Sequence, residues 1–179
     1  MIEITQESKA IQLFLIAQGL AHNTQNFYEK KGAGAGDIAS GAFMKMLRQE
    51  AQSAFGVDYS EKKACQGVGY AFDFYFPDEA SAVEIALSLH NPTSEYEKDI
   101  LKCLLAREDG LAVDSLLFVA RPGAFNRQGA PGPRRIADFV LKKFALKVSV
   151  LELLPGLSAE GVIQAMKRVD DNRAKLQQR

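Results

Sequence analysis

Two carboxylic acids lie in segments where alternating apolar residues predict strands. One face of the segment 71–76 holds the aromatic side chains of Phe72, Phe74 and Phe76. Asp73 lies on the opposite face, because successive side chains of a strand point to opposite sides. One face of the segment 82–89 likewise holds the apolar side chains of Val83, Ile85, Leu87 and Leu89. Glu84 therefore lies on the opposite face of this second strand.

A hairpin between these two strands, turning at residues 77–81, would bring the two acids together. With both apolar faces against one core, Asp73 faces either Glu84 or Ala86, and the Cβ atoms of the two acids are about 5 to 8 Å apart. Two carboxylates at this separation can bind one hard divalent cation such as Mg²⁺. The alternative interpretation is that both acids point to solvent from a half-exposed sheet.

A lysine from the next helix could complete such a site. Residues 94–107 predict a helix, which opens on the capping-box sequence Ser94-Glu95-Tyr96-Glu97. Its expected buried face consists of Ile100, Leu101, Leu104 and Leu105. We expect Lys98 at the edge of this face, within reach of the acids, and Lys102 further toward water. The alternative for Lys98 is a surface ion pair with Glu95.

The acids and their order in the chain resemble the PD-(D/E)XK superfamily of restriction-endonuclease-like nucleases. The resemblance covers residues 37–120, with Asp73 in the place of the family's first acid and Glu84 in the place of its second. The helix, three strands, helix and strand expected over this range are similar to the family's αβββαβ core.

The chain departs from the family pattern at one position. The family's lysine lies two residues after its second acid, and this position is Ala86. Some family members have lost this lysine and use one from the following helix, so the resemblance assigns the role to Lys98, with Lys102 as the second choice. It also implies a third acidic metal ligand, Glu50, in the helix before the strands. The alternative for Glu50 is a solvent-exposed helix face.

The resemblance implies an endonuclease that depends on Mg²⁺ or Mn²⁺, cleaves phosphodiester bonds of DNA and acts as a homodimer. The residue types fit this chemistry. Hydrolysis needs a deprotonated water and stabilised charge on the leaving oxygen, and a metal held by carboxylates provides both. Two alternatives stay open: a catalytically inactive relative that binds DNA or a protein, and an unrelated α/β binding module.

Positive charge is concentrated in the C-terminal half of the chain. Residues 1–90 carry a net charge of −4 and residues 91–179 carry +4. Within the second half, residues 121–147 hold seven basic residues and one acid. Arginine matches phosphate oxygens, and asparagine and arginine commonly read base edges. We therefore expect DNA contacts from Arg121, Asn126, Arg127, Arg134 and Arg135. The alternative is a solvent-exposed loop whose charges serve solubility.

Hydrophobic periodicity predicts the remaining elements. Helices are expected at residues 6–22, 37–55, 134–146 and 158–176, and strands at 58–66, 69–77, 114–120 and 148–154. This order predicts an α/β (α+β) fold, a mixed sheet with an antiparallel three-strand meander and flanking helices. We expect one domain over residues 1–179. Within this domain, we expect a nuclease core at residues 37–120, followed at 121–179 by a basic loop, a helix, a strand and a C-terminal helix.

The composition excludes several other classes. Hydrophobic residues make up 47% and charged residues 25% of the chain, which is typical of a globular domain rather than of a disordered chain or a coiled coil. Cys65 and Cys103 have no CxxC spacing and no nearby histidine, so neither a zinc site nor a disulfide framework is supported. No apolar run is long enough to cross a membrane, and the first residues do not resemble a signal peptide. We therefore expect a cytoplasmic protein without a membrane partner.

Overall fold

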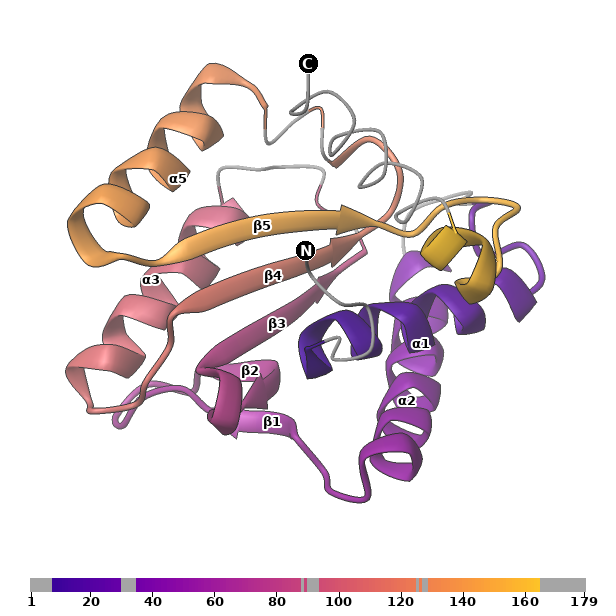
Figure 1. The fold of residues 1–179 in the computed structure, drawn as a ribbon, viewed down its shortest axis with the longest axis horizontal. Coiled ribbons are helices and arrows are strands. Elements are labelled where there is room, and N and C mark those ends of the chain that lie inside the picture. Colours follow the sequence, from indigo (N-terminus) through magenta and orange to yellow (C-terminus); the bar gives the residue numbers. More distant parts are fainter. Residues whose placement is uncertain are drawn as a thin grey trace, which may run out of the picture.

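The computed structural model describes residues 8–29, 35–87, 89, 94–124, 126 and 129–164. Within these residues, five strands form one mixed sheet between two layers of helices (Figure 1). The elements in chain order are α1 (Lys9–Asn23), α2 (Ala35–Phe55), β1 (Ser60–Lys63), β2 (Ala71–Phe76), the 3₁₀ turn η2 (Pro77–Glu79), β3 (Ser81–Ala86), α3 (Ser94–Glu108), β4 (Ser115–Ala120), α5 (Pro131–Phe144) and β5 (Lys147–Glu152). Residues 159–164 are also helical.

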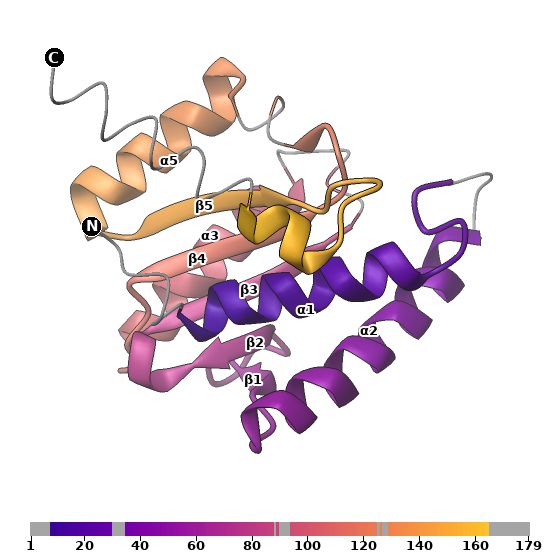
Figure 2. The same ribbon diagram turned by 45° about the vertical axis from the view of Figure 1, so that its right-hand side comes forward.

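The strands lie in the sheet in chain order, from β1 to β5. The first three form an antiparallel meander, and β4 and β5 are added parallel to β3. The two parallel connections contain α3 and α5, and both helices cover the same face, as connections of one hand must. α1 and α2 cover the other face (Figure 2). The mixed α/β fold with its meander is therefore confirmed, and α2 to β4 follow the expected αβββαβ order.

Two clusters of buried apolar residues fill the space between the sheet and its helices. One lies under α1 and α2, and the other under α3 and α5. β4, in the parallel part of the sheet, contributes Leu117 and Val119 to the α1/α2 cluster and Leu116 and Phe118 to the α3/α5 cluster. Burial on both faces explains why this strand is almost entirely apolar.

The aromatic face expected for β2 is divided between the two clusters. Phe74 and Phe76 pack in the α1/α2 cluster, but Phe72 packs in the α3/α5 cluster. In the neighbouring strand β1, Glu61 has a left-handed φ of 53°. On the other side of β2, the pairing with β3 runs only from Phe74 to Phe76, so Phe72 lies beyond the part of the strand that this pairing holds. The expectation that all three phenylalanines share a face is therefore wrong for Phe72.

The element boundaries follow the expected ones to within a few residues, with two differences. β3 ends at Ala86, so Leu89 lies beyond the strand and packs in the α3/α5 cluster, whereas Val83 packs in the α1/α2 cluster. Residues 159–164 begin the helix expected at 158–176, and from residue 165 onward that segment lies outside the described residues. In the part of the chain that the structure describes, no helix is long and apolar enough to cross a membrane.

A buried glutamine joins α1 to the segment that follows β5. Gln18 has no exposed surface. Its side-chain amide donates to the carbonyl of Leu154 at 2.9 Å and to the carbonyl of Leu157 at 2.7 Å, and its side-chain oxygen accepts from the Leu154 amide at 2.7 Å. These bonds satisfy main-chain groups that lie beyond the end of β5, where a buried group needs a partner.

Replacing Gln18 with alanine should lower the free energy of unfolding by about 3 kcal/mol, because three partly buried main-chain groups lose their partner. Urea unfolding followed by circular dichroism measures the change. Gln52→Ala, on the exposed side of α2, is the matched control and should change stability by less than about 0.5 kcal/mol. Equal stability of the two variants would contradict the role of Gln18.

Candidate functional site

The hairpin of β2 and β3 places Asp73 and Glu84 in one cavity, close enough for the charge of Asp73 to act on Glu84. The paired part of the hairpin ends at Phe74 and Val83, and Asp73 and Glu84 are the next residue of each strand, both lining one cavity. Asp73 Oδ2 accepts a hydrogen bond of 2.8 Å from the Ile85 amide, which ties this carboxylate to the neighbouring strand. The structure thus brings the two acids together in the way that the strand pattern predicts.

Both acids line a cavity of about 390 Å³ between the sheet and α3. The charged residues that line it are Asp73, Glu84, Glu95, Lys98, Asp99 and Lys102. They come from β2, β3 and α3, and Ser40 adds a hydroxyl from α2. Convergence of titratable side chains from several elements in one cavity is the usual mark of a reactive or ligand-binding site.

The side chain of Lys102 extends from α3 to the sheet and is only 4% exposed. Its Nζ lies 2.6 Å from Glu84 Oε1 and 2.9 Å from Asp99 Oδ1, and it donates a hydrogen bond of 3.0 Å to the Ala71 carbonyl. An ammonium group has three N–H donors. Three oxygens, one each from β2, β3 and α3, thus lie within 3.0 Å of the ammonium. Among the described residues the contact with Ala71 is the hydrogen bond, the two carboxylates are ion-pair contacts, and the buried Glu84 Oε1 has no hydrogen-bond partner.

The structure reverses the expected positions of the two lysines on α3. Lys98 is exposed where it lines the cavity, and its Nζ lies 5.8 Å from the centroid of the Tyr70 ring. Lys102, expected further toward water, is instead the buried lysine, so that expectation is wrong. The cause is the rotational phase of α3, because Leu101, expected on the buried face, is 51% exposed.

The buried side of α3 combines apolar and charged residues. Its buried residues are Tyr96, Asp99, Ile100, Lys102, Cys103 and Ala106. A helical wheel built from apolar residues alone leaves out the two charged ones and rotates the inferred face toward Leu101. Asp99, which is 7% exposed, is the residue of this site that the sequence analysis missed. The available signal was an Asp–Lys pair at i, i+3 in the helix that follows a strand acid.

Burial and neighbouring charges shift the pKa values of Asp73, Glu84 and Lys102 in this cavity. Burial, together with the negative charges of Asp99 and Asp73, raises the pKa of Glu84 to about 8 against the opposing effect of Lys102. Burial also raises the pKa of Asp73, against the hydrogen bond from the Ile85 amide. Burial alone would lower the pKa of Lys102, but its contacts with Glu84 and Asp99 raise it above the ordinary value. The lysine therefore stays charged.

The charge balance of the cluster favours a cation. Once Glu84 has lost its proton, the buried part of the cavity holds the carboxylates of Asp73, Glu84 and Asp99 and the single ammonium of Lys102. Among the described residues, no group of three or more His, Cys, Asp or Glu side chains is arranged to hold a metal ion. Mg²⁺, however, is commonly held by one or two carboxylates, while waters and substrate phosphates fill the other positions. The pair Asp73 and Glu84 fits this kind of site.

α2 does not bring Glu50 to the cavity. Glu50 is exposed, and Ser40 is the α2 residue that lines the cavity. The positive charge of Arg48, on the same helix, acts on Asp73 and lowers the pKa of that carboxyl, although less than burial raises it. The structure therefore does not place Glu50 with Asp73 and Glu84 as a third acid.

The residues expected to contact DNA lie in different surroundings. Arg121 follows β4 and is half-buried, with its guanidinium carbon 4.7 Å from the centroid of the Phe27 ring. Asn126 is exposed, and Arg134 and Arg135 are exposed near the start of α5. Arg127 lies outside the described residues.

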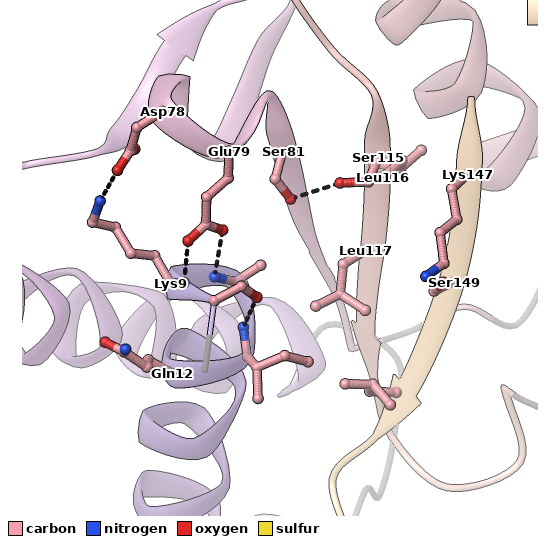
Figure 3. A pocket seen from close by; sticks show the side chains of 14 residues that line it. Lys9, Gln12, Asp78, Glu79, Ser81, Ser115, Leu116, Leu117, Lys147 and Ser149 are labelled. Atoms are coloured by element: carbon pink, nitrogen blue, oxygen red, sulfur yellow. Dashed lines mark hydrogen bonds and ion pairs between the residues drawn. The ribbon is translucent and has the colours of Figure 1, made fainter. Parts of the chain in front are cut away.

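A larger hollow of about 910 Å³ lies at the start of α1, over the first residues of β3, β4 and β5 (Figure 3). Several of its polar side chains make structural contacts. Lys9 forms an ion pair with Asp78, and Glu79 accepts a hydrogen bond of 2.5 Å from the Lys9 main-chain amide at the start of α1. The hydroxyls of Ser81 and Ser115 lie 3.0 Å apart and hydrogen-bond to each other. The smaller cavity, with its buried lysine and acids, is therefore the better candidate site.

Comparisons with known proteins assign no family to this chain. It matches no protein-family model, no curated protein and no solved structure. The function of the site must therefore be argued from its own geometry and chemistry.

Replacing Lys102 with methionine should lower the free energy of unfolding by about 3 kcal/mol, because removal of one partner leaves the other charges of a buried cluster uncompensated. Lys98→Met, one turn earlier on the same helix, should change it by less than about 0.5 kcal/mol because Lys98 is exposed. Urea unfolding at neutral pH compares the two variants. A larger loss for Lys98→Met would contradict the assignment of Lys102 as the buried lysine.

The raised pKa of Glu84 predicts a specific dependence of stability on pH. The folded protein holds this proton up to about pH 8, whereas the unfolded chain releases it near the ordinary value of 4.5. The folded state thus binds more protons between these values, so its stability falls as the pH rises through this window, by a few kcal/mol at most. Glu84→Gln removes the titrating group. Urea unfolding from pH 5 to pH 8.5 should show a flatter profile for this variant, and parallel profiles would refute the prediction.

Proposed function

We propose that this protein is a metal-dependent endonuclease that hydrolyses phosphodiester bonds of DNA. In this proposal Asp73 and Glu84 bind Mg²⁺ or Mn²⁺, and Lys102 is the catalytic lysine. The observation that carries it is the buried ammonium of Lys102, 2.6 Å from Glu84 Oε1, beside a second acid on the neighbouring strand. Two acids that merely face solvent would not need a buried lysine between the helix and the sheet.

The resemblance to the PD-(D/E)XK nucleases also supports the proposal. The sequence departs from the family pattern at the position of the family's lysine, and the structure offers another lysine near the same acid. Ala86, in the place of the family's lysine, lines the same cavity with a small side chain. Lys102 reaches Glu84 from α3 instead. A lysine from the following helix is the substitution that the resemblance implies, although Lys98 was the expected donor.

Each residue has a role that follows from its chemistry. The chemistry supplied by a bound divalent cation is polarisation of the phosphate and a lowered pKa of a coordinated water. Asp73 and Glu84 hold the cation through carboxylate oxygens, with the main-chain carbonyl of Ile85 or Ala86 as a further oxygen. Lys102 carries a permanent positive charge into the cavity, where it orients the attacking water or stabilises negative charge that develops on the phosphate.

The proposed substrate contacts come from the second half of the chain. Four basic residues are exposed on α5: Arg134, Arg135, Lys142 and Lys143. Guanidinium groups match phosphate oxygens, and Asn126, a helical residue between β4 and α5, is exposed. Arg121 contributes less, because its guanidinium packs on Phe27. Cleavage of both DNA strands calls for two sites, so the proposed active form is a homodimer, acting in the cytoplasm.

One observation favours a second candidate, a catalytically inactive protein of this fold that binds DNA or a protein partner. The Lys102 ammonium already has three oxygens of the protein within 3.0 Å. An ammonium held in this way could serve only to keep α3 on the sheet. Metal binding together with cleavage distinguishes the two candidates.

Calorimetric titration of Mn²⁺, combined with cleavage of a supercoiled plasmid of mixed sequence in Mg²⁺, tests the proposal. We expect one cation site per chain in the wild type and nicking that EDTA abolishes. The double variant Asp73→Asn/Glu84→Gln keeps the shape of both side chains but removes both ligand charges. It should bind Mn²⁺ at least about 100-fold more weakly and should not nick the plasmid.

The matched control is Glu97→Gln/Glu108→Gln, which removes the same charge from two exposed positions of α3 and should behave like the wild type. Cation binding without nicking would support the inactive candidate. The absence of binding in the wild type would contradict the metal site and favour a binding module in which the acids have no catalytic role.

A further inference from the structure

The buried ammonium of Lys102 lies between two acidic side chains, one from β3 and one from its own helix. Glu84 Oε1, from β3, lies 2.6 Å away, and Asp99 Oδ1, from α3, lies 2.9 Å away. Glu84 is 6% exposed and Asp99 is 7% exposed. Removal of a carboxylate from water is unfavourable by several kcal/mol unless its surroundings compensate. The presence of a second buried carboxylate therefore calls for a physical reason.

Asp99 is not placed as a third ligand for the cation. It lines the same cavity as Asp73 and Glu84. Even so, no three acidic, histidine or cysteine side chains of the described residues are grouped in a way that could hold a metal ion. The carboxylate of Asp99 pairs instead with Lys102, three residues along the same helix. The backbone of α3 thus fixes the two partners relative to each other.

Cation binding at Glu84 creates a conflict for Lys102. The ammonium lies 2.6 Å from one oxygen of this carboxylate, so a divalent cation on the same group would bring two positive charges close together, where they repel. If the ammonium then moved away from Glu84 and had no other carboxylate, it would become an unpaired buried charge. Asp99 removes this difficulty, because it offers an anionic partner that does not have to bind the cation.

We infer that Asp99 is a positioning residue that retains the Lys102 ammonium beside the site while Glu84 binds a divalent cation. This inference rests on the proposed metal site. Asp99 acts through Lys102 and touches neither cation nor substrate. It thereby makes a buried lysine compatible with metal binding at the neighbouring acid, and it keeps that lysine within reach of the reacting phosphate.

A double-mutant cycle on Mn²⁺ affinity, measured by calorimetry, tests the inference. Asp99→Asn should weaken Mn²⁺ binding at least about 10-fold in the wild-type background, as loss of an orienting partner commonly does. In the Lys102→Met background the same change should weaken binding less than about 3-fold, because no ammonium is left to position. Asp99→Glu, which keeps the carboxylate, should restore part of the affinity.

The control for this cycle is Glu97→Gln, which removes an exposed carboxylate from the same helix and should leave Mn²⁺ affinity within about 2-fold of the wild type. Equal losses from Asp99→Asn in both backgrounds would overturn the inference. They would show that Asp99 only adds negative charge to the site or stabilises the fold, and does not position Lys102.

A second measurement needs only the wild-type protein and so does not depend on the folding of any variant. The protein is acetylated with an amine-reactive reagent, with and without Mn²⁺, and the modified lysines are identified by mass spectrometry. Lys102 should stay unmodified in both conditions, whereas the exposed Lys98 reacts in both. Modification of Lys102 that begins when Mn²⁺ is added would overturn the inference, because the ammonium would then have left Asp99.

These outcomes separate the inference from the proposed function. A wild type that binds no Mn²⁺ overturns the metal site and, with it, the role of Asp99. If the wild type binds Mn²⁺ and Asp99→Asn binds it equally tightly, only the role of Asp99 is overturned.

Discussion

The site depends on one constraint, the need to compensate a positive charge that is almost completely removed from water. The ammonium of Lys102 is held by oxygens of Ala71, Glu84 and Asp99, which come from β2, β3 and α3. Because a buried charge is tolerated only with close partners, these three elements cannot shift independently. Phe72 adds to the compensation, since the Lys102 Nζ lies 5.4 Å from the centroid of its ring.

The sheet supplies the rigid frame on which this cluster is built. An antiparallel hairpin brings Asp73 and Glu84 into one cavity, and the parallel strand β4 then holds β3 from its other side. Through the two apolar clusters, helices pack against both faces of the sheet. Side chains held on paired strands keep a fixed separation, which is what a site made from two carboxylates requires.

Hydrophobic periodicity was sufficient to predict the order of elements, the meander and the meeting of the two acids, because these follow from which strand face is apolar. It failed where burial involves charge. α3 buries Asp99 and Lys102 and exposes Leu101, and a pattern that treats charged residues as exposed cannot find such a face. Periodicity also fails for Phe72, which lies beyond the end of the β2–β3 pairing at Phe74, because alternation predicts the face of a residue only where the strand is regularly paired.

The most direct test of the site is a crystal structure of the protein soaked in Mn²⁺, with data collected where manganese scatters anomalously. The proposed metal site predicts one anomalous peak within about 2.5 Å of carboxylate oxygens of both Asp73 and Glu84, with the Lys102 ammonium still beside Asp99. A map without a peak at this position, in crystals whose Asp73 and Glu84 side chains are well ordered, would contradict the metal site.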